Sequence, residues 1–215
     1  MAQRVKTRRY ESPRRREQAA ATRRQILAAA QRLFERQGYA ATTMAAIAAE
    51  AGVALKTVYV AFETKSGLLR ELWHLLLRGD EDDVPVADRR WYQAVLEEPD
   101  PERQLRLTAR NSRIVKERAG ALLGVIRSAA STDPDAAGLW SRIQADFYDN
   151  QHAIAQALQA GKALRRGLTV ARAADVLWTL NHPDLWLLLV GERGWTPHEW
   201  ERWFSETIRS QLLRA

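Results

Sequence analysis

The sequence predicts an all-α protein with a small N-terminal head and a larger helical body. Alanine occurs 35 times and leucine 26 times, whereas valine and isoleucine together occur 19 times, which favours helix over sheet. Apolar residues recur at the spacing of a helix face, and no segment alternates with the period of a half-buried strand. A chain of 215 residues is long enough for one large domain or two small ones.

The basic charge is concentrated in the first third of the chain. Residues 1–66 contain 13 Lys and Arg but only 5 Asp and Glu, whereas residues 67–215 contain 20 Lys and Arg and 21 Asp and Glu. A basic segment joined to a nearly neutral remainder indicates a head that binds a polyanion and a body with another task.

Several classes of function are excluded by what the sequence lacks. The chain has no cysteine, so disulfides and thiolate sites are excluded. The four histidines are far apart and no phosphate-binding, dinucleotide or nucleophile-elbow motif occurs, so we expect no metal, no cofactor and no enzyme. No apolar run could span a bilayer, and no signal core follows the arginine-rich N-terminus. We therefore expect a cytoplasmic protein without a membrane partner.

The elements of the head follow from local signals. We expect residues 1–13 to form a flexible basic arm, which would either extend into solvent or contact DNA. A helix covers 14–37 and ends at Gly38 in a left-handed cap. Thr42 or Thr43 caps a helix to residue 51, Gly52 breaks it, and a third helix covers 55–62. We expect the DNA-binding domain to span 14–64 and the second domain 65–215.

The body is predicted to hold six or seven further helices. One runs over 65–78, an acidic loop follows at 80–83, and a short helix covers 87–96. Asp100 caps a helix to residue 130 that bends near Gly120, and Asp133 with Pro134 starts another to Gly161. The last helices cover 170–191, interrupted at 181–183, and 197–213. Thr196 and Glu199 form the capping box of the final helix.

The segment from Thr42 to Phe62 has the anatomy of a helix-turn-helix, whose second helix enters the major groove of DNA. The residue types at this spacing make the prediction of a helix-turn-helix considerably more specific. They are Leu33-Phe34, Gly38-Tyr39, Thr42-Thr43, Ile47-Ala48, Ala51-Gly52-Val53, Thr57-Val58-Tyr59, Phe62 and Lys65. This pattern resembles the N-terminal domain of the tetracycline-repressor-like (TetR) family of bacterial regulators. The resemblance covers about residues 18–72, and the rest of the chain agrees in length and helix count.

The resemblance implies a set of DNA contacts. Thr43 would cap the first helix of the motif and touch a phosphate, Thr57 would reach the major groove, and Tyr59 and Lys65 would bind phosphates. Arg14 to Arg16, Arg23 and Arg24 would add phosphate neutralisation. The family usually has a small residue or proline where Lys56 stands, and histidine or tyrosine where Ala61 stands. Ala61 lacks the phosphate contact that histidine or tyrosine would make there. We therefore expect Lys56 either to compensate for this contact or to read the edge of a guanine base.

The resemblance also implies that the body forms a homodimer and binds a small-molecule effector. We expect the dimer interface in the last two long helices, at Trp186, Leu189, Trp200, Trp203, Phe204 and Ile208. Trp178 fits the core and the interface equally well. Polar and aromatic residues of the bundle are the candidate ligand pocket, namely Arg110, Asn111, Arg113, Phe147, Tyr148, Gln151, Trp178 and Asn181.

Together these features predict a homodimeric regulator that binds a pseudo-palindromic operator in double-stranded DNA. We expect a repressor that a small, fairly hydrophobic ligand releases, by shifting the helix over 65–78 that joins head to body. The sequence does not distinguish repression from activation. One alternative is an architectural DNA-binding protein without a ligand, against which the neutral body argues. Another is a helical enzyme, for which no catalytic cluster of polar residues is found.

Overall fold

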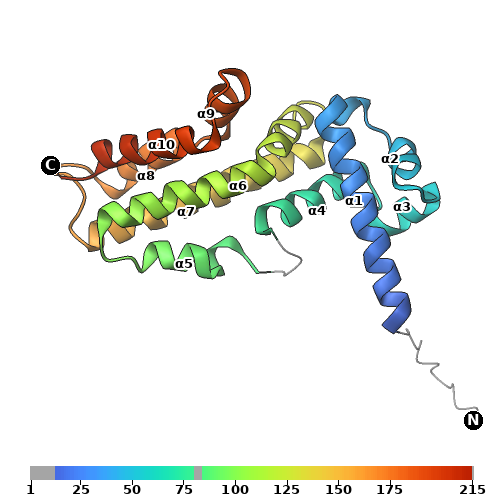
Figure 1. The fold of residues 1–215 in the computed structure, drawn as a ribbon, viewed down its shortest axis with the longest axis horizontal. Coiled ribbons are helices and arrows are strands. Elements are labelled where there is room, and N and C mark those ends of the chain that lie inside the picture. Colours follow the sequence, from blue (N-terminus) through green and yellow to red (C-terminus); the bar gives the residue numbers. More distant parts are fainter. Residues whose placement is uncertain (1–12, 80–83, 215) are drawn as a thin grey trace, which may run out of the picture.

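The computed structural model describes residues 13–79 and 84–214, which form helices joined by short turns (Figure 1). The helices are α1 Pro13–Ala41, α2 Met44–Ala51, α3 Leu55–Phe62, α4 Lys65–Arg78, α5 Arg90–Leu96, α6 Pro101–Ala129, α7 Pro134–Ala160, α8 Val170–Leu180, α9 Pro183–Trp186 and α10 Pro197–Leu212. A 3-10 turn covers Val86–Asp88 and a π-helical segment covers Leu187–Glu192. The described residues contain no strand beyond an isolated bridge between Leu164 and Leu213, so the all-α class is confirmed.

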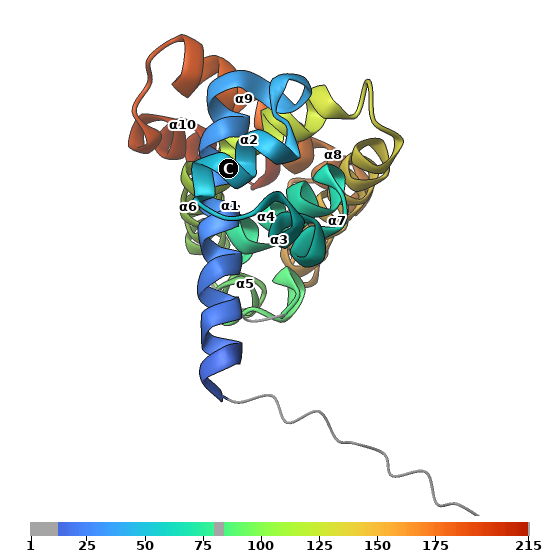
Figure 2. The ribbon, with the colours of Figure 1, turned by 90° about the vertical axis from the view of Figure 1, so that its right-hand side faces the viewer.

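The head consists of α1, α2 and α3 at one end of the molecule. Figure 2 looks onto this end and shows α1 crossing it, with α2 and α3 on the outer side. Thr43 accepts a hydrogen bond from the Ala46 amide and caps α2, and Gly52 ends that helix at φ 67°. The predicted ranges of α2, α3 and α4 are therefore confirmed.

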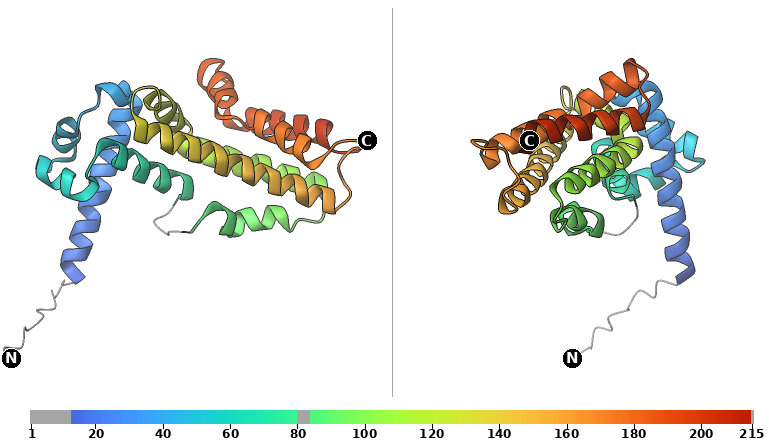
Figure 3. Two further views of the ribbon diagram at one scale, coloured as in Figure 1. Left: turned by 180° about the vertical axis from the view of Figure 1, so that it is seen from behind. Right: turned by 60° about the vertical axis from the view of Figure 1, so that its left-hand side comes forward.

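The body is built on two long helices, α6 and α7, which lie side by side along its length (Figure 3). Helices α8 and α10 cover one side of this pair, and α5 lies on the opposite side (Figure 1). Helix α8 packs mainly on α7, and α10 packs mainly on α6. The segment from α9 to the start of α10 projects from the body.

The hydrophobic core continues from the head into the body. Phe34 and Ile47 of the head belong to one buried cluster with Leu72 of α4 and with Leu122 and Ile126 of α6. A second cluster fills the other end of the body around Trp200 and Phe204. The head is therefore not free to move without disturbing packing in α4 and α6.

One local prediction needs correction. Gly38 has φ 77° and ψ 174°, a positive-φ conformation that differs from a left-handed helical cap, so the residue breaks α1 and a further turn continues to Ala41. Helix α6 runs continuously through Gly120. A Cβ at Gly120 would lie 3.0 Å from Nε1 of Trp186, so this glycine makes room for a tryptophan.

Some predictions fall on residues that the structure does not describe, namely the basic arm up to residue 12 and the acidic run at 80–83. In the described ranges no single helix is long and apolar enough to cross a membrane. The sharply bent pair of α2 and α3 passes the same test of length and composition, although Ile47 and Val58 of that pair are buried in the head.

Candidate nucleic-acid interface and ligand cavity

The helix-turn-helix is rigid because its inner face is buried. The axes of α2 and α3 meet at 111°. Ile47 and Val58 are fully buried where the two helices cross, and Phe62 closes the end of α3. Arg23 of α1 donates to the Ala61 carbonyl at 2.8 Å, and its guanidinium lies 4.3 Å from the centroid of the Phe62 ring. Helix α3 is therefore held from behind by α1.

The outer face of α3 is open and carries side chains that a folded protein usually covers. Leu55 is 42% exposed, Tyr59 is 48% exposed and Val60 is 76% exposed. Lys56 is also exposed on this helix, and Thr57 is half-buried. A short helix that presents apolar, aromatic and basic groups together has a surface suited to the edges of bases and to phosphates.

The structure places Lys65 differently from Lys56. Its ammonium donates to the carbonyls of Tyr39 and Thr42 at 2.8 and 2.9 Å, and it lies 4.0 Å from the centroid of the Tyr39 ring. Burial lowers the pKa of this lysine, although Asp133 opposes the shift. Lys65 thus satisfies carbonyls at the end of α1, a role that the sequence analysis missed. Its contact with a phosphate stays a prediction.

Polar contacts connect the head to the start of α7. The Tyr39 hydroxyl donates to Asp133 at 2.5 Å, and Ser66 donates to Asp135 at 3.1 Å. Asp133 also caps α7 by accepting from the amides of Asp135 and Ala136. The hydrogen bond from Tyr39 lowers the pKa of Asp133, while burial raises the pKa of Tyr39. We call the contact between Tyr39 and Asp133 the head–body latch.

The body contains a cavity of about 510 Å³ between α4, α5, α6 and α7. Most of its wall is apolar, formed by Trp73, Leu77, Trp91, Val95, Val115, Leu123, Ile143, Phe147 and Ile154. Its volume is in the range of pockets that bind small molecules. Helices α4 and α7 both line it, and both also reach the head.

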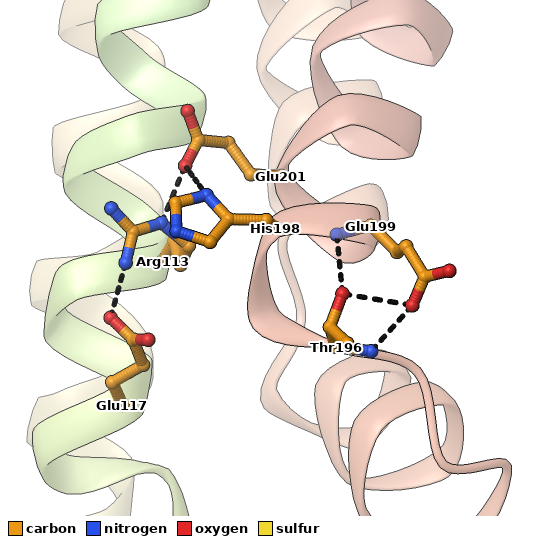
Figure 4. A network of polar contacts seen from close by, with 6 residues as sticks. All are labelled: Arg113, Glu117, Thr196, His198, Glu199 and Glu201. Atoms are coloured by element: carbon orange, nitrogen blue, oxygen red, sulfur yellow. Dashed lines mark hydrogen bonds and ion pairs between the residues drawn. The ribbon is translucent and has the colours of Figure 1, made fainter.

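Four of the eight predicted pocket residues line this cavity: Asn111, Phe147, Gln151 and Asn181. The other four lie elsewhere. Arg110 is exposed, the Tyr148 hydroxyl lies 3.4 Å from Asp175, and the Trp178 ring lies against His182. Arg113 is ion-paired with Glu117 and with Glu201 of α10, close to the capping box of Thr196 and Glu199 (Figure 4). The structure therefore places these four side chains outside the pocket.

The sequence analysis also missed residues of the cavity. Lys116 is buried in its wall, and Gln144 contributes a buried amide. Lys116 lies two turns along the same helix from Thr108, which also lines the cavity, and this helical spacing is a signal that could have indicated it. In the described part of the chain, no three His, Cys, Asp or Glu side chains gather as a metal site would require.

Most residues of the predicted dimer interface are buried inside the protomer. Trp200, Phe204 and Ile208 are fully buried inside the protomer, and Trp186 is 7% exposed. The Trp186 and Trp200 rings pack edge to face at 5.2 Å. Only Leu189 and Trp203 of the predicted set keep part of their surface exposed. The apolar pattern of α10 identified buried residues, but the partner that buries them is the protomer itself.

Comparison with known proteins identifies the head. Residues 26–72 match the model of the bacterial regulatory proteins of the tetR family. Over these residues the head is therefore similar to the regulators of that family. The HTH-type transcriptional regulator AcrR of Shigella flexneri is 42% identical over 59 residues, which make up 27% of each chain. The alignment with this curated relative thus spans about a quarter of its length.

Solved structures share the fold of nearly the whole chain. A transcriptional regulator from Saccharomonospora viridis in complex with choline has a TM-score of 0.71 at 18% identity, with 91% of this chain and 100% of that chain covered. NalD, the secondary repressor of the MexAB-OprM multidrug efflux pump in Pseudomonas aeruginosa, has a TM-score of 0.70 at 23% identity, covering 92% and 98%. These likenesses extend the similarity from the head to the fold of the body.

Proposed function

We propose that the protein is a homodimeric repressor that binds operator DNA through α3 and leaves it when a small, fairly hydrophobic ligand enters the cavity. The observation that carries the proposal is the outer face of α3, where Leu55, Tyr59 and Val60 are exposed beside Lys56 on a rigidly supported helix. Such a face finds its partner in the major groove, where apolar groups meet thymine methyls and cations meet phosphates.

Two protomers are needed because one short helix reads only a few base pairs. The apolar groups left exposed near the C-terminus support pairing there. Leu188 is 46% exposed on the projecting segment, and the rings of Trp195 and Trp203 pair at 6.1 Å with part of their surface open. Exposed aromatic and aliphatic groups of this kind are typical of protein interfaces.

The cavity provides the route from ligand to DNA. Trp73 and Leu77 of α4 line it, and α4 begins at Lys65, directly after α3. Ile143 and Phe147 of α7 also line it, and α7 begins at the head–body latch. A ligand that prefers a different arrangement of α4 and α7 therefore shifts the head, because only a difference in affinity between two states moves their equilibrium. The fold neighbour solved with choline supports ligand binding in this fold.

The test is capture of genomic DNA fragments by the purified protein at two salt concentrations, followed by sequencing. We expect a few pseudo-palindromic sites that persist at the higher salt. Diffuse capture that disappears with salt would instead favour an architectural protein that is attracted only to phosphates.

A matched pair of variants locates the contact on α3. Tyr59→Phe removes only the hydroxyl that we place on a phosphate, so operator affinity should fall by about tenfold or more in the dimer. Tyr148→Phe makes the same change in the body and should leave operator affinity unchanged. Unchanged affinity in Tyr59→Phe would remove this tyrosine from the interface.

A further inference from the structure

Lys116 is a buried cation in the wall of the cavity. The residue is 6% exposed, and its ammonium donates one hydrogen bond, to Oδ1 of Asn181 at 2.5 Å. The nitrogen lies 4.8 Å from the centroid of the Trp200 ring and 5.9 Å from that of Phe147. No carboxylate in the described ranges forms an ion pair with it. An ammonium has three donors, so Lys116 retains capacity for another partner.

Two glutamines of the same wall also lack partners. The amide nitrogen and oxygen of Gln144 and Oε1 of Gln151 are buried without a hydrogen bond. Buried polar groups are nearly always paired in folded proteins, so a group of unpaired ones needs an explanation. These side chains and Lys116 line one cavity, which indicates a ligand with polar atoms of its own.

The charge of that ligand follows from the desolvation of Lys116. Burial lowers the pKa of the amine to about 7 from an ordinary value of 10.5. A buried ammonium is stabilised by an anion at hydrogen-bond distance, whereas a second cation would be repelled. Asp146 and Asp149 also line the cavity, but both are exposed to water, which screens their charge.

We propose that the cavity binds an amphipathic carboxylate, whose head group pairs with the Lys116 ammonium and whose apolar body lies against Trp73, Trp91 and Ile143. Gln144 donates to the second carboxylate oxygen. This proposal rests on the proposed ligand-binding role of the body and specifies the chemical class of the ligand. The apolar body supplies affinity by burial, and the buried ion pair selects the head group.

The experiment compares three probes that share one apolar body: phenylbutyrate, phenylbutanol and phenylbutylamine. Their binding to the full-length protein, without DNA, is measured by calorimetry and by tryptophan fluorescence, since Trp73 and Trp91 line the cavity. We expect the carboxylate to bind about tenfold or more tightly than the alcohol, and the amine to bind weakest. Lys116→Met keeps the volume of the side chain and removes the charge, so it should abolish this preference. Lys162→Met, on an exposed lysine outside the cavity, should retain it.

The outcomes separate this proposal from the function proposed above. Equal binding of carboxylate and alcohol, tighter binding of the amine, no binding of the carboxylate, or a preference that survives in Lys116→Met would each overturn it. None of these results concerns operator DNA, which is absent from the assay. Conversely, loss of operator specificity in the capture experiment would leave the ligand preference measurable.

Discussion

At the scale of single residues, basic side chains beside the helix-turn-helix serve two different purposes. Lys56 is exposed on α3, whereas Lys65 and Arg23 donate to backbone carbonyls inside the head. The sequence places all three in one basic region, because a charge count records their number and not their direction. Which lysine turns inward depends on where α1 ends beside α4, and a local pattern does not contain that information.

The head–body latch yields a prediction about stability. Tyr39→Phe removes the hydroxyl that donates to Asp133 and leaves the ring in place beside Lys65. A hydrogen bond to a charged acceptor is lost, so the free energy of unfolding should fall by ~1–2 kcal/mol. Chemical denaturation measures the change. Tyr59→Phe, at an exposed tyrosine, should stay within ~0.5 kcal/mol of the wild type, and an equal effect of both substitutions would contradict the latch.

The buried Lys116 yields a prediction about pH. The folded protein holds this amine with a pKa of about 7, below its ordinary value of 10.5, so between these values the unfolded chain binds the extra proton. Stability from this residue is therefore lost as the pH falls from about 10 to about 7. The amine faces Asn181, Trp200 and Phe147, none of which titrates in that range. The charge of Lys116 also acts on His182, whose pKa burial lowers below its ordinary value of 6.5 and thus below that range.

Lys116→Met tests this assignment directly. The substitution should raise the free energy of unfolding near neutral pH by ~1–3 kcal/mol, because it removes a desolvated charge. It should also remove the lysine's contribution to the rise of stability with pH. Denaturant unfolding at several pH values, with Lys162→Met as control, provides the comparison. A pH dependence identical to that of the wild type would show that another group is responsible.

At the scale of elements, capping residues made most helix bounds predictable. Asp100, Asp133 and Thr196 cap α6, α7 and α10 as the sequence indicates, and Thr43, one of two candidates, caps α2. Contacts with distant elements are not predictable in this way. Gly120 lies beneath Trp186, and this contact joins residues 66 positions apart.

Two glycines of α6 provide a matched test of this packing. A Cβ at Gly120 would lie 3.0 Å from the Trp186 indole, whereas a Cβ at Gly124 would lie at an ordinary 3.5 Å from Leu187. Gly124→Ala should stabilise the protein by up to ~1 kcal/mol through helix propensity. Gly120→Ala should lose that gain because the indole must shift. Equal stabilisation in thermal unfolding would show that Trp186 yields without cost.

The exposed face of α3 yields a prediction about salt dependence. Lys56→Ala removes one cation per protomer from the proposed interface. The slope of log affinity against log salt concentration should become shallower by about 1 for each protomer. Titrations of operator DNA at several salt concentrations measure it, and Lys162→Ala should leave the slope unchanged. A slope that Lys56→Ala does not alter would place this lysine away from phosphates.

At the scale of the whole molecule, the sequence predicted the architecture better than the sites. The all-α class and the order of head and body follow from composition, caps and the helix-turn-helix spacing. Only half of the predicted pocket residues line the cavity, because the inward and outward faces of α6 and α7 depend on the helices packed around them. The sequence pattern favoured the interface for Trp200 and Phe204, whereas the packing of α10 on α6 buries both inside the protomer.

Reciprocal variants test the division between pairing and DNA binding. Leu188→Glu places a charge on the projecting segment, where we expect the partner protomer, and should convert the dimer to monomer in sedimentation experiments. Val60→Glu places the same charge on α3 and should leave the dimer intact while operator binding is lost. A dimer that survives Leu188→Glu would move the interface to another surface.

The most direct test of the central claim is a hydroxyl-radical footprint of the protein on a captured operator. We expect two protected half-sites on one face of the duplex, separated by about one helical turn or a multiple of it, since two copies of α3 occupy separate major grooves. Val60→Glu should lose both. A single protected patch, or protection that does not depend on Val60, would contradict recognition by paired α3 helices.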